Sequence, residues 1–343
     1  MEDRLAGYMA ELTGSAPKAA GFNSARPWAE WRGELAERFA ARLGPVPEMK
    51  AELNAVELER TMCKGHTRER VEITTFEGLR MAVYLLIPDQ PLARPCPAVI
   101  ALHGHGYGSR DIVGLTPEGE ERTGDPGLHR DFAVSLVQAG FVVAAPEILG
   151  FGDRRLQENL ESGQPAQNSC FRLSAALLLA GHTMAGYRVY ETTRVLDYLE
   201  TRPEVLAERI GVMGISGGGL VAGFTAALDQ RIKCAVVSGY ASTFEASILS
   251  RSHCLDNYIP GILLDAEMPD LLGLIAPRGL FLECGAVDHL FPRHASEEAL
   301  GRLQEIYTAA GTPDGVEADF FDGGHEIHGG PAYEWLTKQL DPR

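Results

Sequence analysis

The chain has 343 residues, of which 45% are hydrophobic and 23% charged, ordinary values for a globular protein that exclude a disordered or fibrous one. Its 31 lysines and arginines stand against 47 aspartates and glutamates, which gives a formal net charge of −16. That charge repels a phosphate backbone, so we expect no nucleic-acid partner.

The first part of the chain is predicted to be helical. The segment WAEWRGELAERFAARLG ends at Gly44, and two prolines follow closely, which is typical of a helix stop. Strand signals begin at residues 71–76 and resume at 79–88 after a Glu-Gly turn, a pattern that predicts an antiparallel hairpin. We therefore expect an N-terminal helical arm over residues 1–69, which covers the domain or pairs subunits in a homo-oligomer, and a catalytic domain over 70–343.

Beyond the hairpin, short apolar runs alternate with helical patterns. Strands are predicted at 97–102, 141–147, 209–216, 233–240, 278–285 and 316–322, and helices at 129–139, 170–202, 217–228, 294–310 and 331–340. Such alternation predicts an α/β fold with a mostly parallel sheet, helices on both faces and the hairpin as an antiparallel edge. The irregular segment 241–277 lies where a cap over a substrate pocket would arise.

Nothing in the sequence indicates a membrane or secreted protein. Every apolar run is broken before the roughly 18 residues that a spanning helix needs. Residues 1–20 are acidic in part and lack the continuous apolar core of a secretory signal. The six cysteines form no C-x-x-C pair, and several stand in apolar runs, as reduced thiols do. We expect a cytoplasmic protein with no membrane partner.

The strongest chemical signal is the G-x-S-x-G pattern at residues 214–218, which falls between a predicted strand and a predicted helix. A nucleophilic serine on a sharp strand-to-helix turn needs small flanking residues, because the helix packs close to it. The N-terminus of the helix also directs free N–H groups and a positive dipole end at a developing oxyanion. Ser216 is therefore the candidate nucleophile, and the amide of Gly217 is a candidate oxyanion donor.

A serine hydroxyl needs a base to take its proton and an acid to orient that base. His325 follows the strand at 316–322 in a Gly-Gly-His-Glu loop and is the preferred base, with His328 as its rival. Asp288 follows the strand at 278–285 and is the candidate acid. The order Ser216, Asp288, His325 is that of the α/β-hydrolases. The second oxyanion donor is expected in the loop His103–Gly106, at the amide of His105.

These motifs resemble the α/β-hydrolase superfamily, in particular the branch of serine esterases similar to dienelactone hydrolase and acetyl xylan esterase. The resemblance rests on HGHGYG at 103–108, GISGG at 214–218, GAVD at 285–288 and GGHE at 323–326. In acetyl xylan esterase-like proteins the x amide of H-G-x-G is an oxyanion donor, which implies that role for His105. Two departures argue against true xylan-esterase specificity: Gly217 replaces the usual glutamine, and Leu149–Gly152 replaces an R-G-Q motif.

The resulting expectation is a serine hydrolase that cleaves a small carboxylic ester through an acyl-enzyme and needs no cofactor. A peptidase or amidase of the prolyl-peptidase-like branch is the alternative, although the N-terminal part is too short for a gating propeller.

His103-x-His105 suggests a metal-dependent hydrolase, but the H-x-H-x-D-H pattern is incomplete, so no metal is expected. Gly104-x-Gly106 only partly matches a dinucleotide fingerprint. A non-catalytic hydrolase-fold binding protein is the remaining alternative.

Overall fold

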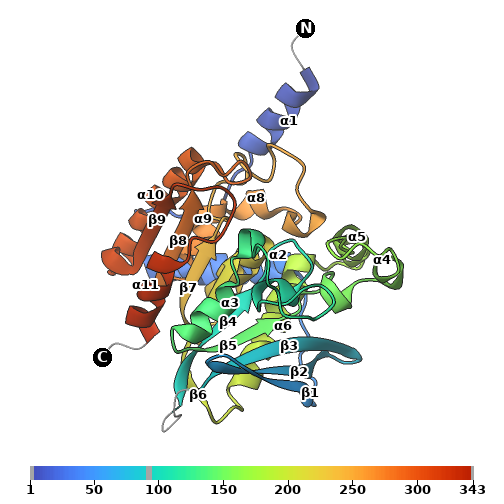
Figure 1. Cartoon of the computed structure of the whole chain (residues 1–343). Coiled ribbons are helices and arrows are strands. Elements are labelled where there is room, and N and C mark those ends of the chain that lie inside the picture. The colour runs from blue at the N-terminus through green and yellow to red at the C-terminus, as the bar shows by residue number, and fades with distance from the viewer. Residues whose placement is uncertain (1–3, 90–94, 341–343) are drawn as a thin grey trace.

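The structure is a computed structural model that describes residues 4–89 and 95–340. Its centre is a nine-stranded sheet with the order β1-β2-β3-β5-β4-β6-β7-β8-β9 (Figure 1). The strands are β1 (Val56–Cys63), β2 (His66–Phe76), β3 (Leu79–Pro88), β4 (Cys96–Leu102), β5 (Val142–Pro146), β6 (Val205–Ile215), β7 (Ile232–Ser238), β8 (Gly279–Gly285) and β9 (Val316–Phe321).

The sheet is antiparallel at one edge and parallel through the rest. β1, β2, β3 and β5 pair antiparallel in that order, whereas β5, β4, β6, β7, β8 and β9 pair parallel. Parallel strands joined by helices place all their carboxyl ends at one edge of the sheet, and ligand sites in open α/β sheets lie at that edge. The predicted mixed sheet with an antiparallel edge is confirmed.

Helices cover both faces of the sheet, and the alternation of side chains along the strands divides the core in two. In β4, Ile100 and Leu102 pack on the face covered by α2, α6, α7, α9 and α10, while Val99 packs on the face covered by α3 and α11. The helices are α1 (Arg4–Gly14), α2 (Trp28–Leu43), α3 (Phe132–Gln138), α4 (Gln157–Leu160), α5 (Cys170–Leu179), α6 (Met184–Leu199), α7 (Gly217–Leu228), α8 (Ile262–Asp265), α9 (Met268–Gly273), α10 (Arg293–Ala309) and α11 (Gly330–Leu340), with 3₁₀ turns η1 (Ser109–Ile112), η2 (Gly127–His129), η3 (Gly152–Arg154), η4 (Leu255–Asn257) and η5 (Pro313–Gly315). Among the described helices, none has both the length and the apolar character required to span a bilayer.

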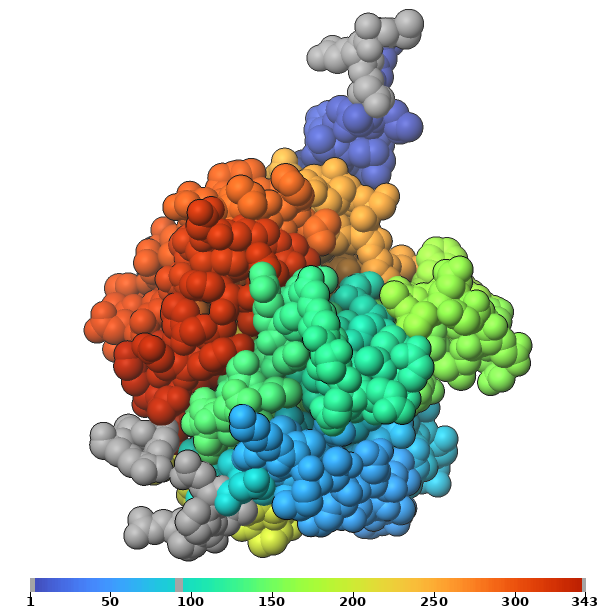
Figure 2. All heavy atoms as spheres, in the orientation of Figure 1, coloured from blue at the N-terminus to red at the C-terminus, as the bar shows by residue number. Residues whose placement is uncertain are grey.

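The N-terminal part corrects one expectation, because residues 1–69 are not helical throughout. β1 and the start of β2 occupy the end of that range. Within residues 4–89 and 95–340, β1 pairs only with β2. It is largely exposed, so it lacks the apolar alternation that is typical of a strand. The two helices also differ: α2 buries its apolar face in the main core, whereas α1 buries no residue and projects from the body (Figure 2).

The helix predicted over 170–202 is also divided, into α5 and α6. Gly181 takes a φ of 79° between them, a conformation that a helix interior does not allow. The hydroxyl of Thr183 then accepts a hydrogen bond from the amide of Gly186 and caps α6. The break brings the N-terminus of α5 close to the carboxyl edge of the sheet, where it contributes Cys170 to the cluster described below.

Candidate active site

Ser216 lies on a sharp turn between β6 and α7. Its backbone has φ 57° and ψ −124°, and it is one of only five non-glycine residues with positive φ in the described chain. Such a conformation costs on the order of 1–3 kcal/mol and persists where the surrounding structure enforces it. The amide of Ser216 donates a hydrogen bond to the carbonyl of Ser238 at the end of β7, at 2.9 Å. The turn therefore holds the serine against the end of the neighbouring strand.

The glycines around this turn are required by space. A Cβ at Gly214 would lie 2.2 Å from the carbonyl oxygen of Gly218, and one at Gly218 would lie 2.1 Å from that of Leu102. Both distances are far shorter than any tolerated contact, and each involves backbone that has no room to move. The close approach that the G-x-S-x-G pattern predicts is thus present on both sides of the serine.

Asp288 and His325 form a close pair at the ends of β8 and β9. His325 Nδ1 and Asp288 Oδ2 are 2.7 Å apart, and the other oxygen of Asp288 accepts hydrogen bonds from the amides of Leu290 and Phe291. The Asp288 side chain is almost fully buried. A carboxylate held in this way fixes both the orientation of the imidazole and the nitrogen that carries its proton.

The imidazole of His325 is enclosed on two sides. The ring of Phe291 stacks on it with centroids 5.8 Å apart. On another side lies Gly239, directly after β7, where a Cβ would be 3.0 Å from His325 Nδ1. Because Ser216 bonds to Ser238 and His325 packs on Gly239, both residues border the same strand end. In the described chain the Ser216 hydroxyl makes no hydrogen bond to His325, and apo sites commonly have loose catalytic hydrogen bonds.

His328, the rival base, lies in a different environment. Its Nδ1 is 2.6 Å from Asp319 Oδ2, and its ring stacks on Phe321 with centroids 4.8 Å apart. Its side chain is 44% exposed, against 17% for His325. His328 is therefore paired with a separate carboxylate near the protein surface.

The loop after β4 abuts the serine turn. A Cβ at Gly104 would lie 3.2 Å from the Cβ of Ser216, so the loop backbone passes directly over that residue. The ring of His105 lies against Gly217, where an added Cβ would be 3.4 Å from His105 Nδ1. Gly217 is the first residue of α7, so its amide has no partner within the helix. The two predicted oxyanion donors, the amides of His105 and Gly217, thus belong to adjoining segments beside Ser216.

Two buried histidines hold this loop in place. His103 Nδ1 is 2.8 Å from the carbonyl of Gly104, and its Nε2 accepts a hydrogen bond from the amide of Ile148. His129 Nε2 accepts a hydrogen bond from the amide of Gly104, while its Nδ1 is 3.2 Å from Asp111. Burial lowers the pKa of His129, which favours the neutral ring that this acceptor role requires. His103 is thus occupied by backbone groups and does not pair with His105.

A second group of chemically reactive side chains lies on the other side of His105, and sequence reasoning missed it. His105, Cys170, Cys254 and Asp256 converge there, beside the buried Arg188. A hydrogen bond from Cys254, helped by the positive charge of Arg188, lowers the pKa of the Cys170 thiol to about 5 despite its burial. No motif links these positions, because they lie far apart in the sequence; the only local signal is the Cys-x-Asp pair at 254–256.

The fold and the geometry around Ser216 define an α/β-hydrolase. Comparison with known proteins agrees: residues 16–323 match the model of the Abhydrolase family, and the chain belongs to that family. A curated relative, "Putative hydrolase YtaP" of Bacillus subtilis (strain 168), is 28% identical over 294 residues, which cover 82% of this chain and 90% of the relative.

Solved structures give the same fold. A "putative acetyl xylan esterase" from Bacteroides fragilis NCTC 9343 superposes with a TM-score of 0.76 at 21% identity, over 92% of this chain and 81% of the other. A glucuronoyl esterase from Solibacter usitatus gives a TM-score of 0.66 at 18% identity, over 90% and 91% of the two chains. The protein therefore has the α/β-hydrolase fold, as the resemblance of its motifs implied.

Proposed function

We propose that this protein is a serine hydrolase that cleaves small carboxylic esters, with Ser216 as the nucleophile, His325 as the base and Asp288 as the orienting acid. One observation carries the proposal: a strained serine at a strand-to-helix turn and a buried Asp–His pair border the end of the same strand, β7. A nucleophile, a base and an oriented carboxylate are the groups that acyl transfer requires.

In the proposed mechanism, His325 takes the proton of Ser216 as the hydroxyl oxygen attacks the ester carbonyl. The amides of Gly217 and His105 stabilise the oxyanion, and Asp288 stabilises the imidazolium. His325 then gives the proton to the departing alcohol. Water hydrolyses the acyl-enzyme by the reverse use of the same groups, and no cofactor takes part.

The ester class is favoured over amides by the names of the structural relatives, which are acetyl xylan and glucuronoyl esterases. In the segment expected to act as a cap, 241–277, the turn η4 lies near the loop that carries His105, because Asp256 Oδ2 is 3.9 Å from His105 Nε2. We propose that this segment limits the size of the acyl group. A peptidase or amidase of the prolyl-peptidase-like branch is the second candidate, and comparison of a p-nitrophenyl ester with the matching p-nitroanilide separates the two.

A fluorophosphonate probe tests the proposal directly. We expect the probe to label the purified full chain at a single serine, which peptide mass spectrometry identifies as Ser216. Ser250, an exposed serine whose hydroxyl bonds to two backbone carbonyls and to the side chain of Arg251, serves as the control: Ser250→Ala keeps the label, whereas Ser216→Ala loses it. Labelling elsewhere, or none in a protein that hydrolyses p-nitrophenyl acetate, would refute the assignment.

Two further expectations stay proposals. We propose a cytoplasmic location, supported by the six cysteines, all present as free thiols.

We also propose that α1 pairs with α1 of a second copy, because Leu5, Tyr8, Met9 and Leu12 repeat at helical spacing and are exposed. Light scattering tests this: deletion of residues 1–14 should convert a dimer to a monomer, and a full chain that is already monomeric would contradict the pairing.

A further inference from the structure

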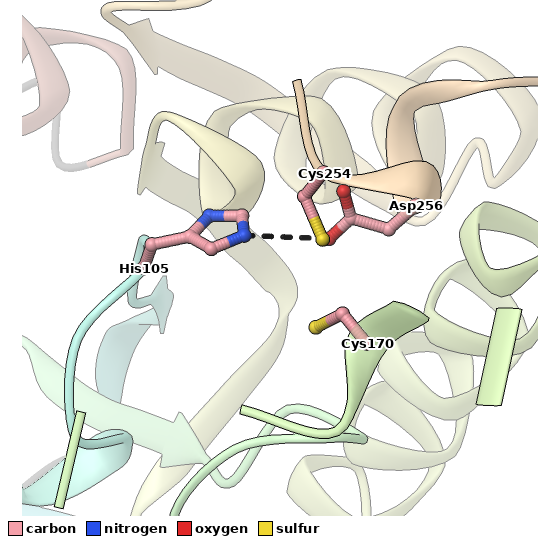
Figure 3. Close-up of side chains that lie close together, drawn as sticks. All are labelled: His105, Cys170, Cys254 and Asp256. Atoms are coloured by element: carbon pink, nitrogen blue, oxygen red, sulfur yellow. Dashed lines mark ion pairs between the residues drawn. The ribbon is translucent and has the colours of Figure 1, made fainter. Parts of the chain in front are cut away.

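Four side chains with metal-binding chemistry converge beside the loop that carries His105 (Figure 3). His105 comes from the loop after β4, Cys170 is the first residue of α5, and Cys254 and Asp256 flank the start of η4. One ring nitrogen, two sulfurs and one carboxylate oxygen all lie within 4.8 Å of one another. In Figure 3 the side chains point from three separate segments toward one common space.

His105 and Asp256 are spaced as two ligands of one ion rather than as direct partners. His105 Nε2 is 3.9 Å from Asp256 Oδ2, which is too long for a hydrogen bond. Zinc–ligand bonds of about 2.0–2.3 Å in a tetrahedron place the ligand atoms about 3.3–3.8 Å apart, so the cluster needs only small side-chain movements to close on an ion. Among the described residues, His105 Nε2 is a buried nitrogen with no hydrogen-bond partner. A buried lone pair without a partner is costly, and a metal ion would satisfy it.

The charges around the cluster also balance with a divalent cation. Arg188 is buried, forms an ion pair with Asp256 and donates a hydrogen bond to Cys170 Sγ at 3.1 Å. Two thiolates and one carboxylate carry three negative charges, and Arg188 together with one divalent ion carries three positive charges. An N–H···S hydrogen bond to a ligating thiolate is also the kind of outer contact that orients metal ligands.

We propose that His105, Cys170, Cys254 and Asp256 bind one zinc ion in a tetrahedral site that fixes the loop beside Ser216. Thiolate and imidazole ligands select zinc over magnesium or calcium, and four protein ligands leave no position open for catalysis. The site departs from our expectation of a metal-free protein, and it does not use the His103-x-His105 pair, because His103 binds backbone groups. The ion would tie α5 and the segment 241–277 to the loop that carries the His105 amide.

A disulfide between Cys170 and Cys254 is the competing interpretation. Both cysteines are free thiols in the structure. A disulfide uses only the two sulfurs and leaves His105 Nε2 without a partner, whereas a metal ion accounts for all four side chains. The zinc site is therefore the better explanation of the cluster.

Metal content tests the proposal independently of esterase activity. The full chain, free of any tag, is reduced, loaded with zinc, freed of excess ion and analysed by mass spectrometry of the metal. We expect about one zinc per chain in the wild type, and at least ten-fold less in Cys170→Ser and in Cys254→Ser. Cys63→Ser, at a half-buried cysteine on β1, is the matched control and keeps the wild-type content. Cobalt loading should give thiolate charge-transfer absorption in the wild type and the control only.

A second measurement needs no variant, so a folding defect does not affect it. Alkylation of the native wild type, mapped by peptide mass spectrometry, should reach Cys170 and Cys254 at least ten-fold more slowly after zinc loading, with Cys63 unchanged. A folded wild type that takes up no zinc would overturn the proposal, as would variants that retain it. A Cys170–Cys254 disulfide in the isolated protein, with no zinc uptake after reduction, would establish the competing interpretation. Because neither readout involves ester hydrolysis, failure here is distinct from failure of the proposed serine mechanism.

Discussion

The structure brings together the residues on the two sides of Ser216 in different ways. On one side, Asp288 and His325 follow consecutive parallel strands, β8 and β9, and they pair where those strands end. On the other side, His105 meets Cys170, Cys254 and Asp256, which come from loops and a helix terminus and share no strand order. Sheet topology determines the first arrangement, whereas only the complete tertiary fold determines the second.

This contrast leads us to expect a division of labour. In the proposed mechanism, Asp288 and His325 take part in the chemistry, and in the proposed zinc site the cluster around His105 positions the loop that carries the His105 amide. Variants on the first side should therefore affect turnover directly, and variants on the second should act through loop placement and metal content.

The largest effect is expected at Ser216. Ser216→Ala should lower kcat on p-nitrophenyl acetate by roughly 10⁴-fold or more, because the nucleophile of the proposed triad is lost. Its zinc content should equal that of the wild type, since Ser216 is not one of the four proposed zinc ligands. Steady-state kinetics and metal analysis of one preparation provide both values. Wild-type turnover in this variant would refute the serine mechanism.

The next effect separates two histidines only three residues apart. His325→Gln should lower kcat by about 10²–10⁴-fold, the usual contribution of a general base. His328→Gln should change it by less than about three-fold, because His328 pairs with Asp319 near the surface. The two variants serve as controls for each other in the same assay. The opposite ranking would make His328 the base.

The sequence predicted the residues that lie just beyond the ends of parallel strands. Asp288 and His325 each lie in the loop that follows a predicted strand, and in the structure Asp288 Oδ2 and His325 Nδ1 are 2.7 Å apart. Most strands and helices were also predicted, because buried parallel strands are continuous apolar runs.

The sequence did not predict β1 or the cluster that contains Cys170 and Cys254, because the first has a weak strand pattern and the second joins distant residues. β1 is an exposed edge strand without apolar alternation, so its residues did not suggest a strand. Cys170 and Cys254 are separated by α6, β6, α7 and β7, so no spacing rule connects them. Only packing of the segment 241–277 against the N-terminus of α5 brings these cysteines together.

A smaller effect on turnover is expected from the loop cluster. Removal of zinc by dipicolinate should lower kcat of the wild type by about ten-fold or more, because the loop that carries the His105 amide would lose the contacts that position it. KM should change less. Cys254→Ser should start at the lower rate and not respond to the chelator, while Cys63→Ser should respond as the wild type does. An equal response in all three proteins would show that the chelator acts elsewhere.

The smallest effect concerns the stability contributed by His129, whose Nε2 accepts a hydrogen bond from the amide of Gly104 in the loop after β4. Burial lowers the pKa of His129 relative to an exposed histidine, so the unfolded chain binds the proton first as the pH falls. The stabilisation by the neutral ring is therefore complete above the unfolded pKa of about 6.5 and is lost as the pH falls through the lower folded value. The free energy of unfolding, measured in urea between pH 8 and pH 5, should decrease over that window.

His129→Gln tests the source of that decrease. The glutamine side chain reaches the position of Nε2 and keeps an acceptor for the Gly104 amide, so we expect a loss of at most about 1 kcal/mol at pH 8. Because glutamine does not titrate, the stability of the variant should depend less steeply on pH below 6.5, and the two curves should converge toward acid pH. The nearby Asp111 titrates at lower pH, because its hydrogen bonds and charge interactions with His129 and Arg122 outweigh burial and lower its pKa. An unchanged slope would mean that a group other than His129 accounts for the pH dependence.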